Sequence, residues 1–411
     1  MKGNLKYLFK SFVFFVQSTL IKRHYDVVFL YLNHFNRSEQ GTNPYYIPAI
    51  EFCKAHNLSY VVFEDTDLKG AYKSQPRDEM AIPFDFITLM HIVLLKLIKF
   101  FSKVFLKKSN GIEIKANKII KFLFFRKFKS TIIINMAGNK LGLLRCVSQG
   151  AIYEMQHGII CKEKTGWLAN GAVDKTIQEH KIMALVYGIG FKNYLIENDQ
   201  SRYYNEKNVV ALGQSMFTKQ ISAKTFNKNI LVSLQITPDF KDTLFDAYVG
   251  FINEIIENNS QFFINNNYTL ILRHHPRYHG KIDVIRDKSF IKIDASDNIS
   301  QAIKQAGLHL TLHSTTSFEC ALLGVPTLFM EIKGFDSPTQ IFINEYKYPV
   351  AASVIYSAQD FLNQLQKTIK NYHSNSIAVM NWASLYYQKF NSDKFLDILA
   401  HDSSLNSENE N

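Results

Sequence analysis

The stretch Leu270-Ile271-Leu272-Arg273-His274-His275-Pro276-Arg277 is the most informative guide to the fold. It begins as a short apolar run of the kind that forms a buried strand, and then turns abruptly to arginine, histidine and proline. In an open parallel sheet, ligands bind beyond the carboxyl ends of the strands. The two arginines and two histidines therefore predict an anion-binding site at a strand end. The plain alternative is a basic turn whose side chains are solvated.

A second polar stretch follows a later strand of the same half. The residues His313-Ser314-Thr315-Thr316-Ser317-Phe318-Glu319 come directly after the apolar run 308–312 and lead into a predicted helix over 317–323. Free N–H groups and the positive dipole end at the start of a helix suit a phosphate. A Ser/Thr helix cap without a ligand is the alternative. Because both stretches lie at strand ends of one half, together they favour phosphate binding.

Strands and helices alternate along the chain. The sequence predicts strands over 26–32, 60–64, 130–135, 151–154, 183–187 and 209–212 in the first half, and over 230–234, 269–273, 290–293, 308–312 and 327–330 in the second. Nearly continuous apolar runs separated by helices indicate parallel sheets that are covered on both faces. We therefore expect an α/β protein with two Rossmann-like halves.

The 411 residues exceed the size at which a single core usually stops growing. A polar segment that starts at Gly213-Gln214-Ser215 marks the boundary. We expect a Rossmann-like domain over 1–215, a second over 228–372, and a helix crossing back over 373–400, where the helical pattern itself runs over 378–399. The polar tail over 401–411 is expected to be disordered.

The net charge of +11 favours anionic partners such as phosphorylated substrates, nucleic acid or a membrane surface. No zinc-finger spacing, aromatic RNA-binding signature or long Lys/Arg block supports a nucleic acid partner. The four cysteines lack the spacing of a metal site or a disulfide scaffold, and the N-terminal run 7–20 lacks a signal-peptide cleavage site. We expect a cytoplasmic protein with no metal site and no cofactor.

Residues 84–106 are the segment whose composition raises the question of membrane contact. They are rich in Ile, Leu, Val and Phe, but the charged residues among them make a bilayer span costly. Lysines at positions 96, 99, 103 and 107 recur with helical spacing, which favours a helix lying at the inner face of the cytoplasmic membrane. The alternative is an amphipathic helix that packs on its own domain with its lysines in water.

The two motifs also carry a family resemblance. A strand ending in His275-Pro276, with a later Ser314-Thr315-Thr316-Ser317, Glu319 and Leu323-Gly324-Val325-Pro326, resembles the donor half of GT-B glycosyltransferases that assemble bacterial capsules and lipopolysaccharide. Similar elements occur in bacterial sialyltransferases and polysialyltransferases, capsule Kdo transferases and CDP-glycerol glycerophosphotransferases. The resemblance covers about residues 150–335. It implies two Rossmann-like domains whose parallel sheets face a central cleft.

The resemblance also implies roles for these residues. It places His275, Pro276, Ser314 and Thr315 at the nucleotide phosphate, often of CMP or CDP, and Glu319 near the ribose or base. From their position at strand ends, Arg273 and Thr316 join this donor-binding set, which would stabilise the leaving phosphate electrostatically without a metal.

The first half offers a third element, Tyr153-Glu154-Met155-Gln156-His157-Gly158. It resembles the Gln-His-Gly of the acceptor half of the same transferases. His157 or Glu154 is the expected general base, and an extended strand would direct the two side chains to opposite faces. We rank His157 first, because Gly158 is expected to permit a tight turn beside it. The alternative is a strand-end histidine in a satisfied turn.

The expected function is transfer of a sugar from a nucleotide-activated donor, with a CMP-sugar favoured, to a surface polysaccharide or lipid-linked glycan. Three alternatives stay open. They are a polyol-phosphate transferase of the CDP-glycerol type, a sugar-nucleotide 2-epimerase, and a non-catalytic membrane-associated scaffold that binds nucleotide sugars or lipid head groups.

Overall fold

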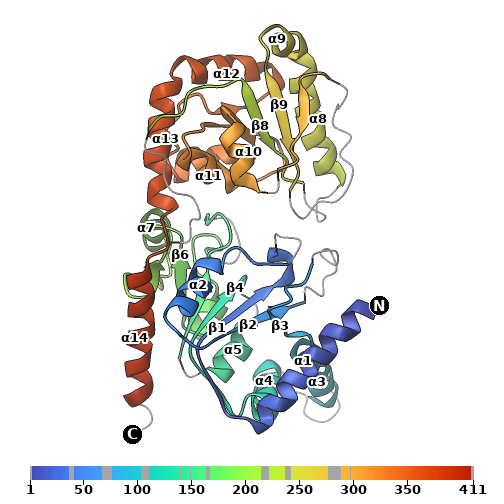
Figure 1. The fold of residues 1–411 in the computed structure, drawn as a ribbon, viewed down its shortest axis with the longest axis vertical. Coiled ribbons are helices and arrows are strands. Elements are labelled where there is room, and N and C mark those ends of the chain that lie inside the picture. Colours follow the sequence, from blue (N-terminus) through green and yellow to red (C-terminus); the bar gives the residue numbers. More distant parts are fainter. Residues whose placement is uncertain are drawn as a thin grey trace. The chain divides into compact units, whose positions relative to one another are not determined.

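The computed structural model describes residues 2–36, 41–66, 76–102, 111–138, 140–148, 150–162, 167–213, 222–236, 242–275, 288–296 and 298–408. The chain groups into two compact units. Unit 1 comprises Met1–Val186, Lys192–Gln214 and Phe390–Asn411, and unit 2 comprises Tyr187–Phe191 and Ser215–Lys389. Each unit has one sheet with helices around it (Figure 1).

Unit 1 contains a parallel sheet with the order β3-β2-β1-β4-β5-β6-β7. Its strands are β1 (Arg23–Leu32), β2 (Tyr60–Asp65), β3 (Ile82–Pro83), β4 (Phe128–Met136), β5 (Ala151–Met155), β6 (Ile182–Val186) and β7 (Val209–Ala211). The central strands are apolar on both faces because helices cover both sides of the sheet. The sequence did not predict β3, which is only two residues long and lies at the edge, where a proline is tolerated.

The helices of unit 1 surround this sheet. They are α1 (Lys2–Leu20), α2 (Ile47–Ala55), α3 (Asp85–Phe101), α4 (Ile112–Phe124), α5 (Leu141–Val147), α6 (Lys175–Glu179), the greater part of α7 (Ile189–Asn198) and α14 (Ser392–Glu408). A short 3-10 turn, Asn33–Phe35, follows β1. Among the described residues, no helix is long and apolar enough to cross a bilayer.

Unit 2 repeats the pattern with the parallel order β10-β9-β8-β11-β12-β13. Its strands are β8 (Asn229–Ser233), β9 (Thr269–Arg273), β10 (Ile291–Ile293), β11 (Leu308–Thr311), β12 (Thr327–Met330) and β13 (Val354–Ile355). The helices are α8 (Asp242–Asn258), α9 (Ser260–Asn265), α10 (Ile299–Gln305), α11 (Thr316–Leu322), α12 (Phe361–Lys370) and α13 (Tyr372–Tyr386). The two parallel sheets with flanking helices confirm the predicted α/β fold class.

An aromatic cluster joins α11 to α13 in unit 2. Phe318 of α11 is fully buried, and its ring stacks on Trp382 at 4.7 Å and on Tyr387 at 5.3 Å between centroids. The Trp382 indole N–H donates to the Tyr346 carbonyl at 2.7 Å, so the buried ring leaves no unsatisfied donor. This packing holds the polar residues at the start of α11 against the body of unit 2.

The C-terminal region differs from the prediction. The sequence predicted a helix over 378–399, but the structure has two helices, α13 in unit 2 and α14 in unit 1. The chain between them is tied down by backbone bonds from Gln388 N to Tyr187 O and from Asn391 N to Leu212 O. The Asn391 side chain then accepts from Lys394 N at 2.9 Å, as a helix cap does.

The disordered tail predicted over 401–411 remains a prediction. Helix α14 continues to Glu408, although its last turns have no apolar period. Its first turns are anchored in the core of unit 1 through Phe395 and Ile398. Residues 409–411 lie outside the described residues.

Replacing the central ring of the aromatic cluster should destabilise unit 2. Because Phe318 is fully buried, Phe318→Ala should lower the free energy of unfolding by about 3–5 kcal/mol. Urea unfolding followed by near-UV circular dichroism measures this change. The control Ile264→Ala alters a side chain of α9 that is half exposed, and should have a much smaller effect. Equal effects of the two variants would contradict the assigned packing.

Candidate functional site

The strand order of unit 2 reverses between β8 and β11, and this is where ligands bind in open α/β sheets. Gln235 lies just beyond β8. Its side-chain oxygen accepts from Thr311 Oγ1 at 3.2 Å and from His313 N at 2.8 Å. Gln235 therefore ties the ends of the two strands together and fixes the backbone at the start of the Ser/Thr motif.

Arg273 is the last residue of β9, the strand next to β8. Its side chain already has partners within the protein. Its guanidinium forms an ion pair with Asp294 and donates to the Ser296 carbonyl at 3.1 Å. Burial alone would raise the pKa of Asp294, but hydrogen bonds from Ser296 and Arg273 hold that pKa below its usual value. The positive charge predicted to face a ligand is thus partly neutralised within the protein.

Glu319 lies on α11 within the electrostatic reach of Arg273. Burial raises the pKa of Glu319 to about 7, and Arg273 only partly offsets the increase. At neutral pH this carboxyl is therefore poised between its protonated and ionised forms. Such a group can donate a hydrogen bond to a ligand or accept one from it.

Some polar groups of the Ser/Thr motif form hydrogen bonds with one another at the start of α11. Ser314 Oγ accepts from Thr316 N at 3.2 Å and donates to Thr316 Oγ1 at 3.0 Å. His313 Nε2 lies 3.7 Å from a carboxylate oxygen of Asp336. The side chains of 314–316 are all half-buried, so they remain partly accessible from solvent.

Of the other two residues predicted at the phosphate, one is described by the structure and one is not. His275 follows β9 and is half-buried, whereas Pro276 lies outside the described residues. The Leu-Gly-Val-Pro element has a structural explanation in this chain. Gly324 adopts a left-handed φ of +72° just after α11, the usual conformation at a helix end before the chain turns into the next strand.

In unit 1, Glu154 is buried inside the sheet. One carboxylate oxygen accepts from Asn135 Nδ2 at 3.0 Å and the other from Gly138 N at 2.8 Å. Burial raises the pKa of Glu154 to about 7, although these hydrogen bonds act in the opposite direction. Ala137 and Gly138 both have positive φ, so Glu154 holds a tight loop at the end of β4.

His157 lies just beyond β5 and is half-buried. Its ring meets Phe35 edge-on, with 5.1 Å between centroids. Phe35 belongs to the turn after β1, so this contact spans the point in unit 1 where the strand order reverses. His157 thus lies at the strand edge where the fold places ligands.

Position 158 does not need a glycine for its backbone conformation. Its φ is not in the left-handed range, and a Cβ atom added to it would have no atom within 4 Å. The chain bends at this position, but neither a left-handed backbone conformation nor crowding within the unit requires glycine there.

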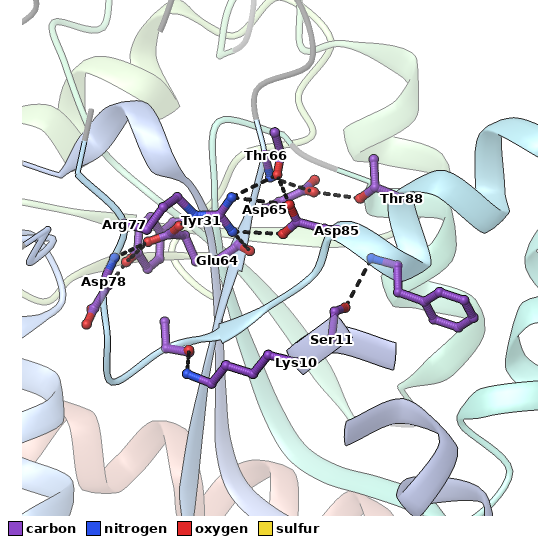
Figure 2. Close-up of polar contacts among 12 residues, drawn as sticks. Lys10, Ser11, Tyr31, Glu64, Asp65, Thr66, Arg77, Asp78, Asp85 and Thr88 are labelled. Atoms are coloured by element: carbon purple, nitrogen blue, oxygen red, sulfur yellow. Dashed lines mark hydrogen bonds and ion pairs between the residues drawn. The ribbon is translucent and has the colours of Figure 1, made fainter. Parts of the chain in front are cut away.

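The sequence analysis did not predict the buried ion network at the end of β2, which Figure 2 shows. Arg77 forms ion pairs with Glu64 and with Asp85, the latter at 2.8 Å, and donates to Thr66 Oγ1 at 3.0 Å. The guanidinium also stacks over the Tyr7 ring of α1 at 4.6 Å.

The neighbouring carboxylate of the network is Asp65. It forms an ion pair with Lys140, which follows the β4 loop, and accepts from Thr88 Oγ1 at 2.5 Å. The signal in the sequence was the pair Glu64-Asp65 at the end of a predicted strand. Its partners lie in loops and helices far along the chain, which no short-range pattern identifies.

Comparison with known proteins supports the fold. A variant of the wall teichoic acid polymerase TagF aligns with a TM-score of 0.53 and 10% identity, over 99% of this chain and 98% of that chain. MnaA of S. aureus, solved with UDP, aligns with a TM-score of 0.52 and 10% identity, over 93% and 97%. No protein-family model and no curated protein matches the sequence. At such identity the likeness shows a shared fold.

Glu154→Gln should change how stability depends on pH. Because burial raises the folded-state pKa of Glu154 from 4.5 to about 7, the folded protein keeps a proton that the unfolded chain releases. Wild-type stability therefore falls as pH rises from about 4.5 to about 7, by about 3 kcal/mol from this group. The uncharged glutamine removes that part of the fall.

Thermal unfolding of wild type and Glu154→Gln between pH 4.5 and pH 8 tests this. Glu51→Gln, which changes an exposed glutamate of α2, controls for the loss of one negative charge. If the melting temperatures of wild type and Glu154→Gln changed with pH in the same way, the prediction would be contradicted, because Glu154 would then not carry a buried charge.

Two glycine substitutions test whether position 158 needs a glycine. Gly158→Ala should leave the melting temperature almost unchanged, because the added methyl group meets nothing. Gly150→Ala should lower it markedly, because the added Cβ would lie 1.8 Å from the Thr131 carbonyl oxygen. Circular dichroism melting curves compare the two. A large loss in Gly158→Ala would restore the structural role that the sequence suggested.

Proposed function

We propose that this chain is a metal-independent glycosyltransferase that uses a nucleotide-activated sugar. The observation that carries the proposal is the polar edge of unit 2, where His275, Gln235 and the 313–316 motif follow neighbouring strands on both sides of the point where the strand order reverses. The fold shared with TagF and with MnaA, which was solved with UDP, supports the nucleotide-binding part of the proposal.

In this proposal unit 2 binds the donor. His275 and Pro276, with Ser314, Thr315 and Thr316, contact the phosphate. Arg273 adds positive potential while it keeps Asp294 ionised. Glu319 contacts the ribose or base, and its pKa of about 7 lets it act as donor or acceptor near neutral pH.

Unit 1 supplies the base in the proposed mechanism. His157 takes the proton of the acceptor hydroxyl as the acceptor oxygen bonds to the anomeric carbon. The bond from that carbon to the phosphate oxygen breaks, and the nucleotide leaves with the electron pair, stabilised by the residues of unit 2. This path inverts the anomeric centre. Glu154 is the weaker candidate base, because it is buried and both its oxygens accept hydrogen bonds, so we assign it to holding the β4 loop.

The finer assignments follow from the resemblance of the motifs. We propose a CMP-sugar as donor and a surface polysaccharide or lipid-linked glycan as acceptor, at the inner face of the cytoplasmic membrane. A polyol-phosphate transferase is the second candidate, because a TagF structure soaked with CDPG also shares the fold, with a TM-score of 0.52 and 11% identity.

Thermal shift with CMP, CDP, UDP, GDP and dTDP tests the donor, since a ligand that binds only the folded state raises the melting temperature. A selective shift with CMP supports a CMP-sugar, and one with CDP supports the polyol-phosphate candidate. A shift with UDP or GDP keeps the transferase and changes the sugar. Turnover of a nucleotide sugar without any acceptor would indicate an epimerase instead. No shift with any nucleotide, in a folded protein, favours the scaffold.

Substitutions test the division of roles. His275→Ala combined with Ser314→Ala should weaken nucleotide binding at least tenfold, whereas His157→Ala should keep binding and abolish transfer. The matched control is His373→Ala with Ser374→Ala, which alters two exposed side chains of α13 in the same unit. Melting temperatures without ligand separate a binding defect from loss of the α11 cap at Ser314. Equal loss of binding in all variants would overturn the division.

A further inference from the structure

We propose that the outer face of α1, α3 and α4 binds the surface of an anionic lipid bilayer. More than half of the large apolar side chains that are exposed among the described residues lie on these three helices. Soluble monomers rarely leave so much apolar surface in one place unless it serves an interaction.

On α1 the outward face is apolar. Leu5 is 69% exposed and Phe9 is 66% exposed, and Phe12 and Leu20 are also exposed. The spacing of 5, 9, 12 and 20 places these side chains in one narrow stripe along the helix. The inward face carries the buried Ser11, Phe15 and Ser18. An ordinary surface helix has the reverse pattern, with its polar residues in water.

The same feature recurs on the two neighbouring helices. Helix α3 buries only Ile87 and Thr88 of its 17 residues. Its exposed apolar residues are Leu89, Val93, Leu97, Phe100 and Phe101, and those of α4 are Ile114, Ile119, Phe122 and Leu123. Both helices therefore present apolar side chains to solvent over several turns.

These three helices lie side by side in unit 1 (Figure 1). Phe86 of α3 meets Phe12 of α1 at 5.1 Å and Phe124 of α4 at 5.2 Å between ring centroids. The backbone N–H of Phe86 also donates to Ser11 Oγ at 3.0 Å. The helices thus form one packed layer.

The positive charge of this face indicates an anionic membrane as its partner. The exposed lysines on these helices are Lys6, Lys96, Lys99, Lys115 and Lys118. Of the two carboxylates in the sequences of the three helices, Asp85 is paired with Arg77, which leaves Glu113. Phe and Leu interleaved with Lys is the composition of helices that lie in the headgroup region of anionic membranes. A second copy of the chain would instead bring two equally basic faces together.

The helices are suited to lie along the bilayer. Among the described residues none is long and apolar enough to span it. Lysines within the apolar stripe, such as Lys96 beside Val93 and Leu97, can extend their amines to the lipid phosphates while their stems stay among the acyl chains. This inference stands apart from the proposed catalytic roles, because none of those residues lies on α1, α3 or α4.

Flotation of the full chain with vesicles tests the proposal. We expect binding to vesicles of phosphatidylglycerol and phosphatidylcholine, and at least tenfold weaker binding to phosphatidylcholine alone. Phe9→Glu, Leu97→Glu and Phe122→Glu, one on each helix, should each reduce binding at least tenfold. The controls Leu385→Glu and Leu396→Glu, which change exposed leucines of α13 and α14, should not. Lys96→Gln and Lys118→Gln should each reduce binding about fivefold.

Two further results complete the test. Folding of the variants is checked by their melting temperatures, since all seven altered side chains are exposed. Nucleotide thermal shifts should be unchanged in them, which separates failure of this proposal from failure of the proposed function. No vesicle binding by wild type, equal binding with and without phosphatidylglycerol, or a dimer in sedimentation that Phe9→Glu abolishes would overturn it.

Discussion

Parallel pairing is the constraint on which the rest of this structure depends. It brings the carboxyl ends of all strands in a sheet to one edge, so polar side chains at those ends meet one another in partly buried surroundings. A buried carboxylate must then be paired or take up a proton. Glu64 and Asp65 are paired with Arg77 and Lys140. Glu154 is held by neutral donors, and its pKa rises.

Parallel pairing also explains why the strand limits and the fold class could be predicted from the sequence. Apolar runs such as 269–273 and 327–330 were assigned their observed strand limits because a buried parallel strand must be apolar on both faces. The alternation of those runs with helices was enough for the fold class. The two-residue strands β3 and β13 carry too few residues for any pattern, and were missed.

The site was less predictable. Arg273 was expected to face a ligand, but its pairing with Asp294 depends on two strands meeting in register, which the local sequence does not reveal. The partners of Glu64 and Asp65 come from separate loops for the same reason. Helical periodicity identified an apolar face on residues 84–106, but it does not say whether that face points inward. The packing of the three helices determines this, and in α3 the exposed face includes Leu89, Val93 and Leu97.

The segment Tyr187–Phe191 has a consequence for how such proteins change over time. It gives unit 2 a piece of chain from within the sequence of unit 1, and Phe191 packs within 5.4 Å of Phe318 and 5.2 Å of Tyr386. Phe390–Asn411 in turn returns a helix to unit 1. Neither unit is one continuous stretch of sequence, so a genetic crossover at the 214/215 junction would exchange an incomplete half. Diversification of this architecture is therefore expected to proceed through substitutions at the strand ends more readily than through recombination of whole units.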